Sequence, residues 1–192
     1  MRDMGQLKIS VLALLVFTII CGAVYPVVVT GAGYIFFRDK AAGSLLIKEG
    51  VIRGSVFIGQ NFTRPEYFHG RPSAVSYDSS LSGGSNLGHT SSKLDDQVIK
   101  RDEALRKVNN LPADFPIPED LLFASGSGLD PHISVDSALL QAGRIASERK
   151  VEVSDIENVI KQYSERQIPF YGKRFVNVLK LNAALDGMGV AR

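Results

Sequence analysis

Three short segments of the chain contain the residue types that catalysis or ligand binding usually needs. They are Tyr67–Ala74, with an arginine beside aromatic residues, Ser82–Ser85, with consecutive glycines, and Ser125–Ser134, with serines, an aspartate and a histidine. A guanidinium binds anions or stacks on aromatic rings, glycine amides cradle phosphates, and Ser, His and Asp together are typical of hydrolases. Each segment also has a purely structural interpretation.

The third segment lacks the spacing of a hydrolase nucleophile. A nucleophile elbow needs glycine two residues before and two residues after the serine. Ser125 has Phe123 and Ser127 at those positions, and Ser127 has Ser125 and Leu129. Catalytic triads are also usually assembled from separate elements. The segment instead predicts the end of a strand, a glycine turn and the start of a helix, and no catalytic residue is assigned to the chain.

Polar residues of this third segment suit the start of that helix. Asp130 or Ser134 would accept hydrogen bonds from the first free N–H groups, and Pro131 suits a first helical turn. His132 is either a structural side chain or a titrating switch, because imidazole changes charge near neutral pH. The candidate residues for a partner or loop contact are Arg71, Ser125, Gly126, Ser127, Gly128, Asp130 and His132.

The Ser/Gly loop has one functional and one plain interpretation. Leu81-Ser82-Gly83-Gly84-Ser85 is similar to the LSGGQ signature of ABC-type ATPases, with Ser85 where glutamine is expected. It is not a P-loop, because no Gly-Lys-Ser/Thr follows. Ser82, Gly83, Gly84 and Ser85 are therefore candidate nucleotide contacts, and the alternative is an ordinary Ser/Gly turn.

Arg71 likewise has two interpretations. Next to Tyr67, Phe68 and His69 it would stack on a ring or bind an anion. Alternatively it braces a loop whose aromatic side chains belong to the core.

Composition excludes several classes of site. The net charge is +2, which gives no nucleic-acid footprint. The single cysteine, Cys21, allows no internal disulfide and no cysteine-based metal site. The three histidines are scattered without the spacing of metal ligands, so no metal or cofactor of its own is assigned to the chain.

Hydrophobic periodicity predicts the elements that position these segments. The predicted strands are 54–60, 120–124 and 174–181, and the predicted helices are 92–109 and 134–149. A further helix should follow a capping box, Ser154 to Glu157, with Ile156, Val159, Ile160 and Tyr163 as its apolar stripe. Residues 61–86 are predicted to form a loop. This order of elements favours one α/β (α+β) domain.

The residues before this domain form a long apolar run. Ile9 to Phe37 contains no charged residue and no histidine, and as a helix it would reach about 43 Å, more than the roughly 30 Å of a bilayer core. A retained anchor is favoured over a cleaved signal peptide, because the run continues beyond the usual limit of a signal sequence. The predicted organisation is a tail at 1–8, a transmembrane helix at 9–37 and a soluble domain at 38–192.

The direction of the anchor is not fixed by charge. Arg2 and Lys8 precede the run, and Arg38, Lys40, Lys48 and Arg53 follow it. A simple count would place the domain in the cytoplasm, but long domains translocate largely regardless of charge.

Taken together, the segments resemble a known family, the C subunit (KdpC) of the bacterial Kdp potassium-transporting ATPase. The resemblance covers essentially the whole chain. One departure is His89-Thr90, where the family often has proline and a small polar residue. The matching blocks are GSVFIGQNF (54–62), YFHGRPSA (67–74), SGGSNLG (82–88), ASGSGLDPHIS (124–134), QAGRIASER (141–149) and VNVLKLN (176–182).

The resemblance implies a non-catalytic subunit of a high-affinity, ATP-driven potassium pump in the bacterial inner membrane. It implies three partners: a channel-like potassium-binding subunit, a P-type ATPase subunit and a small membrane subunit. It also implies one transmembrane helix, with the soluble domain on the extracytoplasmic side. Two roles follow from it: assembly with gating of ion entry, or action as a catalytic chaperone that contacts ATP through Ser82–Ser85. An extracytoplasmic domain cannot easily reach cytosolic ATP, which favours assembly and gating. The alternative is a membrane-tethered nucleotide-binding protein.

Small residues give the apolar run a second interpretation. Gly22, Pro26, Gly31 and Gly33 would let neighbouring helices approach closely, and a kink at Pro26 would be tolerated within a bundle. The plain alternative is that glycine and proline are simply common in membrane helices. These four residues are the candidate membrane-docking positions.

Overall fold

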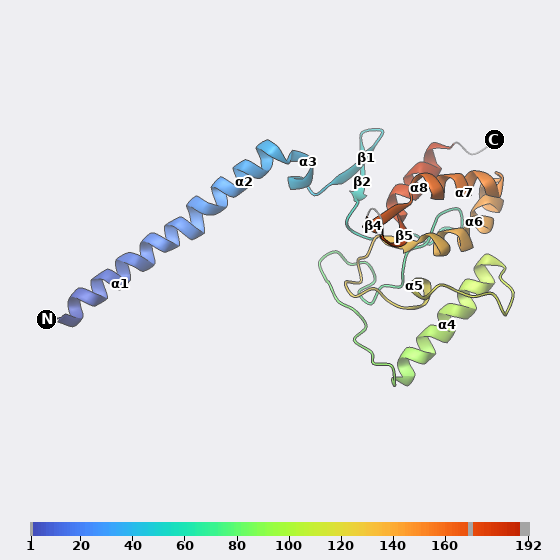
Figure 1. Ribbon diagram of the computed structural model, residues 1–192, viewed down its shortest axis with the longest axis horizontal. Coiled ribbons are helices and arrows are strands. Elements are labelled where there is room, and N and C mark those ends of the chain that lie inside the picture. The colour runs from blue at the N-terminus through green and yellow to red at the C-terminus, as the bar shows by residue number, and fades with distance from the viewer. Residues whose placement is uncertain (1, 169–170, 189–192) are drawn as a thin grey trace. The chain divides into compact units, whose positions relative to one another are not determined.

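The structure is a computed structural model that describes residues 2–168 and 171–188. The chain divides into two compact units, with the boundary after Leu45. The first is a long helix with one apolar span, and the second contains helices and two small antiparallel sheets (Figure 1). This arrangement confirms the predicted fold class, one apolar N-terminal helix followed by an α+β domain.

The N-terminal unit consists of α1 (Arg2–Ile19), a π-helical turn η1 (Ile20–Val24), α2 (Tyr25–Phe36) and the short helix α3 (Arg38–Ala41). Gly5–Phe36 is long and apolar enough to cross a membrane, and none of its apolar window is buried inside this chain. The π turn ends at Val24, two residues before Pro26, and the N–H of Tyr25 bonds to the carbonyl of Ile20. A π turn is one of the adjustments that accommodate a proline without breaking the helix.

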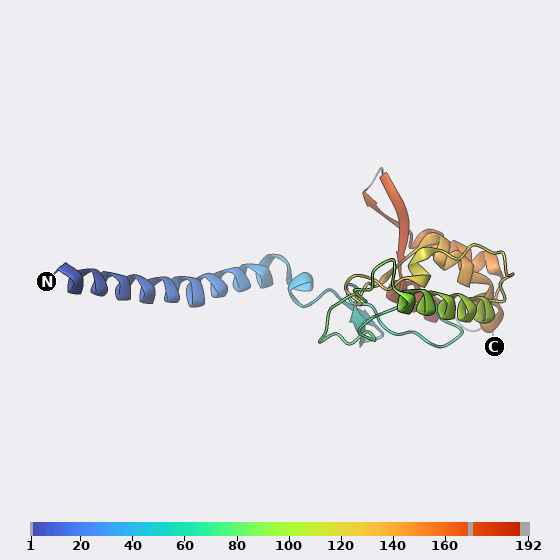
Figure 2. The ribbon, with the colours of Figure 1, turned by 90° about the horizontal axis from the view of Figure 1, so that it is seen from below.

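The second unit begins with a β-hairpin, continues through a long irregular segment and ends in alternating helices and strands. Its elements are β1 (Leu45–Lys48), β2 (Val51–Ser55), α4 (Ser92–Asn109), α5 (Glu119–Leu122), β3 (His132–Ser134), α6 (Val135–Arg149), α7 (Val153–Gln162), β4 (Glu165–Ile168), β5 (Tyr171–Asn177) and α8 (Val178–Gly187). The main sheet has the order β3-β5-β4, antiparallel throughout, with Ile133 opposite Val176 and Arg166 opposite Arg174. Figure 2 shows the β4–β5 hairpin (orange to red) projecting away from the helices.

The core lies between the sheet and helices α6, α7 and α8. Its fully buried members include Phe68, Ile133, Ala138, Ile145, Ile156, Ile160, Val176, Leu181 and Leu185. Helix α6 contacts α7, α4 and both β3 and β5, so it is the central element of the domain. Phe68 brings an irregular loop into this core, and the backbone of that loop needs hydrogen-bond partners.

Two of the predicted helices are confirmed, and so is the apolar stripe of a third. The 92–109 prediction coincides with α4, and 134–149 with α6 and its N-cap Ser134, whose side chain accepts a bond from the N–H of Ser137. Ile156, Val159 and Ile160 are buried on α7, with Tyr163 packed against the core. These elements have strong 3.6-residue periodicity, which local sequence encodes well.

Three strand predictions are wrong in whole or in part. The strand predicted at 54–60 ends at Ser55, since Gly54 has φ +144° and a turn follows, and its partner is the preceding segment 45–48. The segment 120–124 is instead mostly helix α5, which follows Pro118 and begins with two acidic residues. The strand predicted at 174–181 ends at Asn177, whose side chain accepts from the N–H of Lys180 and starts α8.

Two local capping predictions are also wrong. Helix α7 starts at Val153 with Glu152 as its N-cap, so Ser154 already lies within the helix and forms no capping box with Glu157. Pro131 precedes strand β3 rather than lying in a first helical turn. In both places the structure starts its element a few residues from where the local pattern indicates.

Candidate functional site

The irregular loop that carries Phe68 is held by two side-chain amides, which pair with its backbone as a neighbouring strand would. The N–H of Phe68 donates to Asn182 Oδ1 (2.8 Å), and Asn182 Nδ2 donates back to the Phe68 carbonyl (3.0 Å). Gln141 does the same for His69, accepting from its N–H (2.8 Å) and donating to its carbonyl (3.2 Å). Both amides are buried. They satisfy backbone groups that the irregular loop cannot pair within itself.

Two buried arginines of α6 also bind the backbone of this loop. We call these arginines and the two amides, Gln141 and Asn182, the loop clamp. Arg144 donates to the carbonyls of Pro65 and Tyr67 and to Asn109 Oδ1. Arg149 donates to the carbonyls of Glu66 and Leu185 and lies over the Tyr67 ring. Burial lowers the pKa of Arg144 to about 10, which still leaves it charged at neutral pH. The two arginines therefore fix the backbone of residues 65–67.

Further along the chain, Ser73 and Tyr77 link this loop to the Ser125–Ser134 segment through hydrogen bonds and packing. Ser73 Oγ donates to the Gly128 carbonyl (2.6 Å) and accepts from the N–H of Tyr77 (2.9 Å). The Tyr77 hydroxyl donates to the Arg71 carbonyl, and burial raises the pKa of that phenol to about 12. Gly70 leaves room for this ring, because a Cβ there would lie 2.6 Å from Tyr77 Oη.

The Ser/Gly loop packs against the same segment. The N–H of Gly83 donates to the Ser127 carbonyl (2.9 Å), and the Ser82 hydroxyl makes a longer bond to the same oxygen (3.4 Å). A Cβ on Gly84 would lie 3.3 Å from the Gly126 carbonyl oxygen. Gly128 has φ +69°, and a Cβ there would lie 2.8 Å from the Gly83 carbonyl oxygen. The glycines of the two loops therefore let their backbones approach each other.

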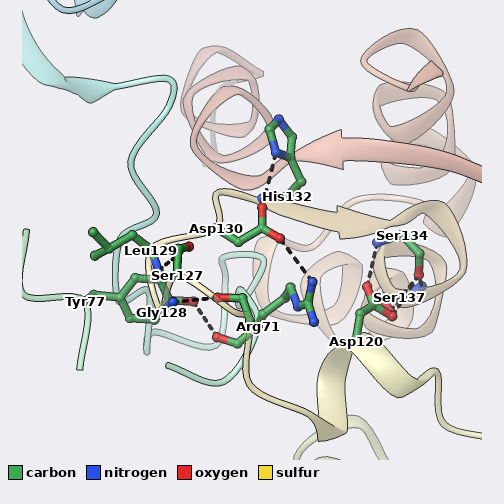
Figure 3. Close-up of polar contacts among 11 residues, drawn as sticks. Arg71, Tyr77, Asp120, Ser127, Gly128, Leu129, Asp130, His132, Ser134 and Ser137 are labelled. Atoms are coloured by element: carbon green, nitrogen blue, oxygen red, sulfur yellow. Dashed lines mark hydrogen bonds and ion pairs between the residues drawn. The ribbon is translucent and has the colours of Figure 1, made fainter. Parts of the chain in front are cut away.

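Arg71, Asp130 and His132 form a short polar chain beside these loops (Figure 3). Arg71 Nη1 lies 3.1 Å from Asp130 Oδ2, and Asp130 Oδ1 accepts from the N–H of His132 (3.0 Å) with His132 Nδ1 at 3.3 Å. Burial alone would raise the pKa of Asp130, but its bonds with His132 and the charge of Arg71 outweigh burial and lower it. Arg71 therefore braces a loop, and its buried Nε has no partner among the residues that the structure describes.

Asp120 forms a second polar cluster at the start of α6. It accepts from the N–H of Ser134 (2.7 Å), from Ser134 Oγ and from Ser137 Oγ (2.6 Å), as Figure 3 shows. This arrangement confirms the N-cap role expected of Ser134 and adds a carboxylate from α5, which sequence reasoning had assigned to a strand. Asp130, the other predicted cap, instead turns the chain before β3.

An open cleft of about 1170 Å³ lies next to these two clusters. Arg71, Asp130, His132 and Lys173 line it together with an apolar wall that includes Ile117, Phe123, Leu139, Leu140 and Phe175. His132 meets the edge of the Phe175 ring at 5.0 Å between centroids.

The structure thus brings together Arg71, the Ser82–Ser85 loop and the 125–132 segment, three sets that the sequence could only treat separately. Gly22, Pro26, Gly31 and Gly33 lie in the other unit, on the apolar helix. The residues that sequence reasoning missed are Gln141, Arg144, Arg149 and Asn182. Their signal was present, because each is a polar residue on or beside the buried stripe of a helix.

Comparison with known proteins decides the family. The family model described as "K+-transporting ATPase, c chain" (KdpC) matches residues 7–187. The chain belongs to the KdpC family. The KdpC subunit of the potassium-transporting ATPase of Mycobacterium tuberculosis is 50% identical over 184 residues, covering 94% of this chain and 97% of that protein.

Two further KdpC relatives come from other bacterial groups. The subunit of Methylococcus capsulatus is 46% identical over 189 residues, covering 96% of this chain and 98% of its own length. That of Serratia proteamaculans is 45% identical over 190 residues, covering 96% and 100%. Family membership makes this KdpC chain a subunit of a potassium-transporting ATPase complex, and its apolar helix fits a membrane-associated subunit.

Proposed function

We propose that this KdpC chain is a non-catalytic subunit that assembles the potassium pump and gates ion entry from the extracytoplasmic side of the bacterial inner membrane. Its partners would be the channel-like potassium-binding subunit, the P-type ATPase subunit and the small membrane subunit. The chain would carry no cofactor of its own, and ATP would be bound by the complex. The single-pass anchor would be Gly5–Phe36.

One observation carries the choice of assembly over direct nucleotide contact: the N–H of Gly83 is already bonded to the Ser127 carbonyl. A phosphate-binding glycine loop works by pointing free N–H groups at the ligand. Here the loop uses that donor internally, and Gly84 packs on Gly126. The motif is therefore accounted for by loop packing, and the loop cluster would present a fixed surface to a partner.

The membrane helix supports the assembly role. Apart from the backbone of its own helix, a Cβ on Gly22, Gly31 or Gly33 would meet no atom within 4 Å in the described part of the N-terminal unit. Small residues on a membrane helix allow another helix to pack at close range. The four docking residues would therefore contact transmembrane helices of the other subunits.

The side of the membrane is testable by cysteine labelling in intact cells. In a Cys21→Ser chain, Leu81→Cys (55% exposed) places a thiol beside the Ser/Gly loop, and Gln6→Cys places one before the apolar run. A membrane-impermeant maleimide should label Leu81→Cys before lysis and Gln6→Cys only after it. The reverse pattern would contradict the extracytoplasmic assignment and bring the loop back within reach of cytosolic ATP.

The nucleotide alternative has its own test. ATP is titrated into the full chain in detergent micelles, with Ser82→Ala/Ser85→Ala as the paired variant. We expect no saturable binding at millimolar ATP. Saturable binding that the double variant loses would favour the nucleotide-binding alternative and the catalytic chaperone role.

A further inference from the structure

The β1–β2 hairpin carries a cluster of exposed apolar side chains that the domain core does not use. Ile47, Val51, Ile52 and Phe57 are 60%, 54%, 60% and 65% exposed, and we call these four residues the hairpin patch. Of the other large apolar side chains exposed in the described part of the domain, Phe115, Phe123 and Leu139 line the cleft described above and are less exposed, at 39–42%. Scattered exposed apolar residues are normal, but a contiguous cluster marks an interaction surface.

The hairpin holds this patch in a defined position. Glu49 and Gly50 have φ of +54° and +74°, as a two-residue type I′ turn requires. On β1, Lys48 Nζ donates to the Ala183 carbonyl of α8 (2.6 Å), and at the end of β2, Gln60 Nε2 donates to the Arg53 carbonyl (2.9 Å). Lys48 is half-buried against α8, while Ile47 beside it points outward. With a two-residue turn, Ile47 and Ile52 lie opposite each other on the face away from Lys48, while Val51 lies beside the turn and Phe57 follows the end of β2. The patch is thus the free face and the turn end of a hairpin that Lys48 fixes to α8.

The covalent chain indicates what covers the patch. Residues 37–44 alone separate the end of the apolar helix at Phe36 from β1, and even fully extended they span only about 30 Å. Helix α3 takes up four of these residues and shortens the reach. A hairpin on so short a tether stays close to the surface of the bilayer that its own helix spans.

The charges of this segment fit the same surface. Residues 38–57 contain Arg38, Lys40, Lys48 and Arg53 against Asp39 and Glu49, a net charge of +2. Arg53 is exposed beside Ile52. Apolar side chains flanked by cations are typical of segments that lie in the headgroup region of an anionic membrane.

We propose that the hairpin patch inserts into the interfacial layer of the bilayer that holds this chain's own helix, giving the domain a second attachment to the membrane. The two attachments flank the short connection at residues 37–44 and restrict how the domain can turn about its anchor. The inference rests on the helix being membrane-spanning, but it does not depend on the side of the membrane on which the domain lies.

The test is depth-dependent quenching of a fluorophore in the full-length chain. A Cys21→Ser chain with Ile52→Cys carries an environment-sensitive dye and is reconstituted into vesicles of phosphatidylethanolamine and phosphatidylglycerol containing nitroxide lipids. Val153→Cys, exposed on α7, is the matched control in the domain, and Val16→Cys in the helix is the positive control. We expect the dye at position 52 to be quenched several-fold more than at 153, and less than at 16.

Three results would overturn the proposal, and they are distinguishable. Equal quenching at positions 52 and 153, with strong quenching at 16, means that the helix inserts but the patch does not. No quenching at 16 means that the membrane anchor itself is wrong. Protection of position 52 from an aqueous quencher only when the other pump subunits are reconstituted with the chain means that the patch binds protein. An Arg53→Glu variant, which leaves the patch intact, should weaken the lipid quenching at position 52.

Discussion

Glycines serve opposite purposes in the two units of this chain. On the apolar helix, a Cβ added to Gly22, Gly31 or Gly33 would meet no atom within 4 Å in the described part of the N-terminal unit, apart from the backbone of its own helix. In the loops of the domain, a Cβ on Gly59 or Gly128 would lie less than 3.0 Å from backbone oxygen atoms of this same chain. The helix glycines leave space that this chain does not fill, whereas the loop glycines make room for this chain's own backbone.

The contrast extends to polar groups. In the domain, buried side chains such as Gln141, Arg144 and Asn182 are hydrogen-bonded to the backbone of the loop around Phe68. The apolar helix buries none of its apolar window within the chain. A Gly-rich motif therefore has to be interpreted from what fills the space around it. Glycines in the loops let segments of this chain's own backbone pack together, whereas glycines on the apolar helix leave room for another molecule.

The largest predicted loss of stability concerns the buried polar side chains of the domain. Arg144→Met removes donors from the carbonyls of Pro65 and Tyr67, and each buried group left without a partner costs about 1–3 kcal/mol. We expect the free energy of unfolding to fall by at least about 3 kcal/mol, measured by denaturant titration of the full chain in micelles. Lys100→Met, on the exposed face of α4, is the matched control and should change stability by no more than about 0.5 kcal/mol. Equal losses of stability in the two variants would contradict the stabilising role of the loop clamp.

A smaller predicted loss of stability tests whether the loop glycines are needed for backbone packing. Gly128→Ala forces a φ of +69° on alanine and places its Cβ 2.6 Å from Val75 Cγ2, so we expect a loss of about 2–4 kcal/mol. Gly83→Ala is the control, because a Cβ there meets nothing within 4 Å. It should cost well under about 1 kcal/mol and leave its bond to Ser127 in place. If Gly83→Ala were the more damaging variant, the packing explanation of the Ser/Gly loop would be wrong.

The smallest effect concerns pH. Burial, and then the charge of Arg144, lower the pKa of His69 below its ordinary value of 6.5. The unfolded chain therefore binds a proton at higher pH than the folded chain does. The stability contributed by neutral His69 is fully present above about pH 6.5 and is lost as the pH falls toward the lowered pKa.

The measurement is the change in unfolding free energy between neutral and mildly acidic pH for the wild type and for His69→Gln. The variant keeps the backbone bonds to Gln141 and should lose less stability on acidification. His89→Gln, at an exposed position, should behave like the wild type. An unchanged slope in His69→Gln would show that this half-buried imidazole does not contribute to the pH dependence.

Periodic elements could be predicted from the sequence, while pairings across long sequence separations could not. Helices α4 and α6 follow from local apolar spacing, and so does the apolar span before the domain. The strand predicted at 120–124 was wrong because a short apolar run has no period that distinguishes strand from helix, and the acidic first turn, Glu119 and Asp120, favours helix α5. The strand β4 has no apolar alternation at all, since Glu165 and Arg166 are exposed, and only its pairing with β5 defines it.

The candidate site shows the same limit. The sequence identified Arg71, the Ser/Gly loop and the 125–132 segment as separate motifs, but not that they pack on one another. That contact depends on Ser73 and Gly128, which are 55 residues apart. Asn182 is recognisable as a polar residue beside a buried stripe, but nothing near it in the sequence identifies its partner Phe68, which lies 114 residues away.

The proposal that the apolar helix docks on partner subunits is tested most directly by the yield of the other pump subunits that co-purify with helix variants of this chain. In α2, Pro26 and Gly33 lie seven residues apart on one face of the helix, whereas Gly31 lies on the opposite face. We expect Gly31→Leu/Gly33→Leu to lower the co-purified yield several-fold while the unfolding free energy of the domain stays unchanged. The two single variants would then show which face binds. Full co-purification with the double variant would contradict the claim that the helix glycines are a docking surface for partner subunits.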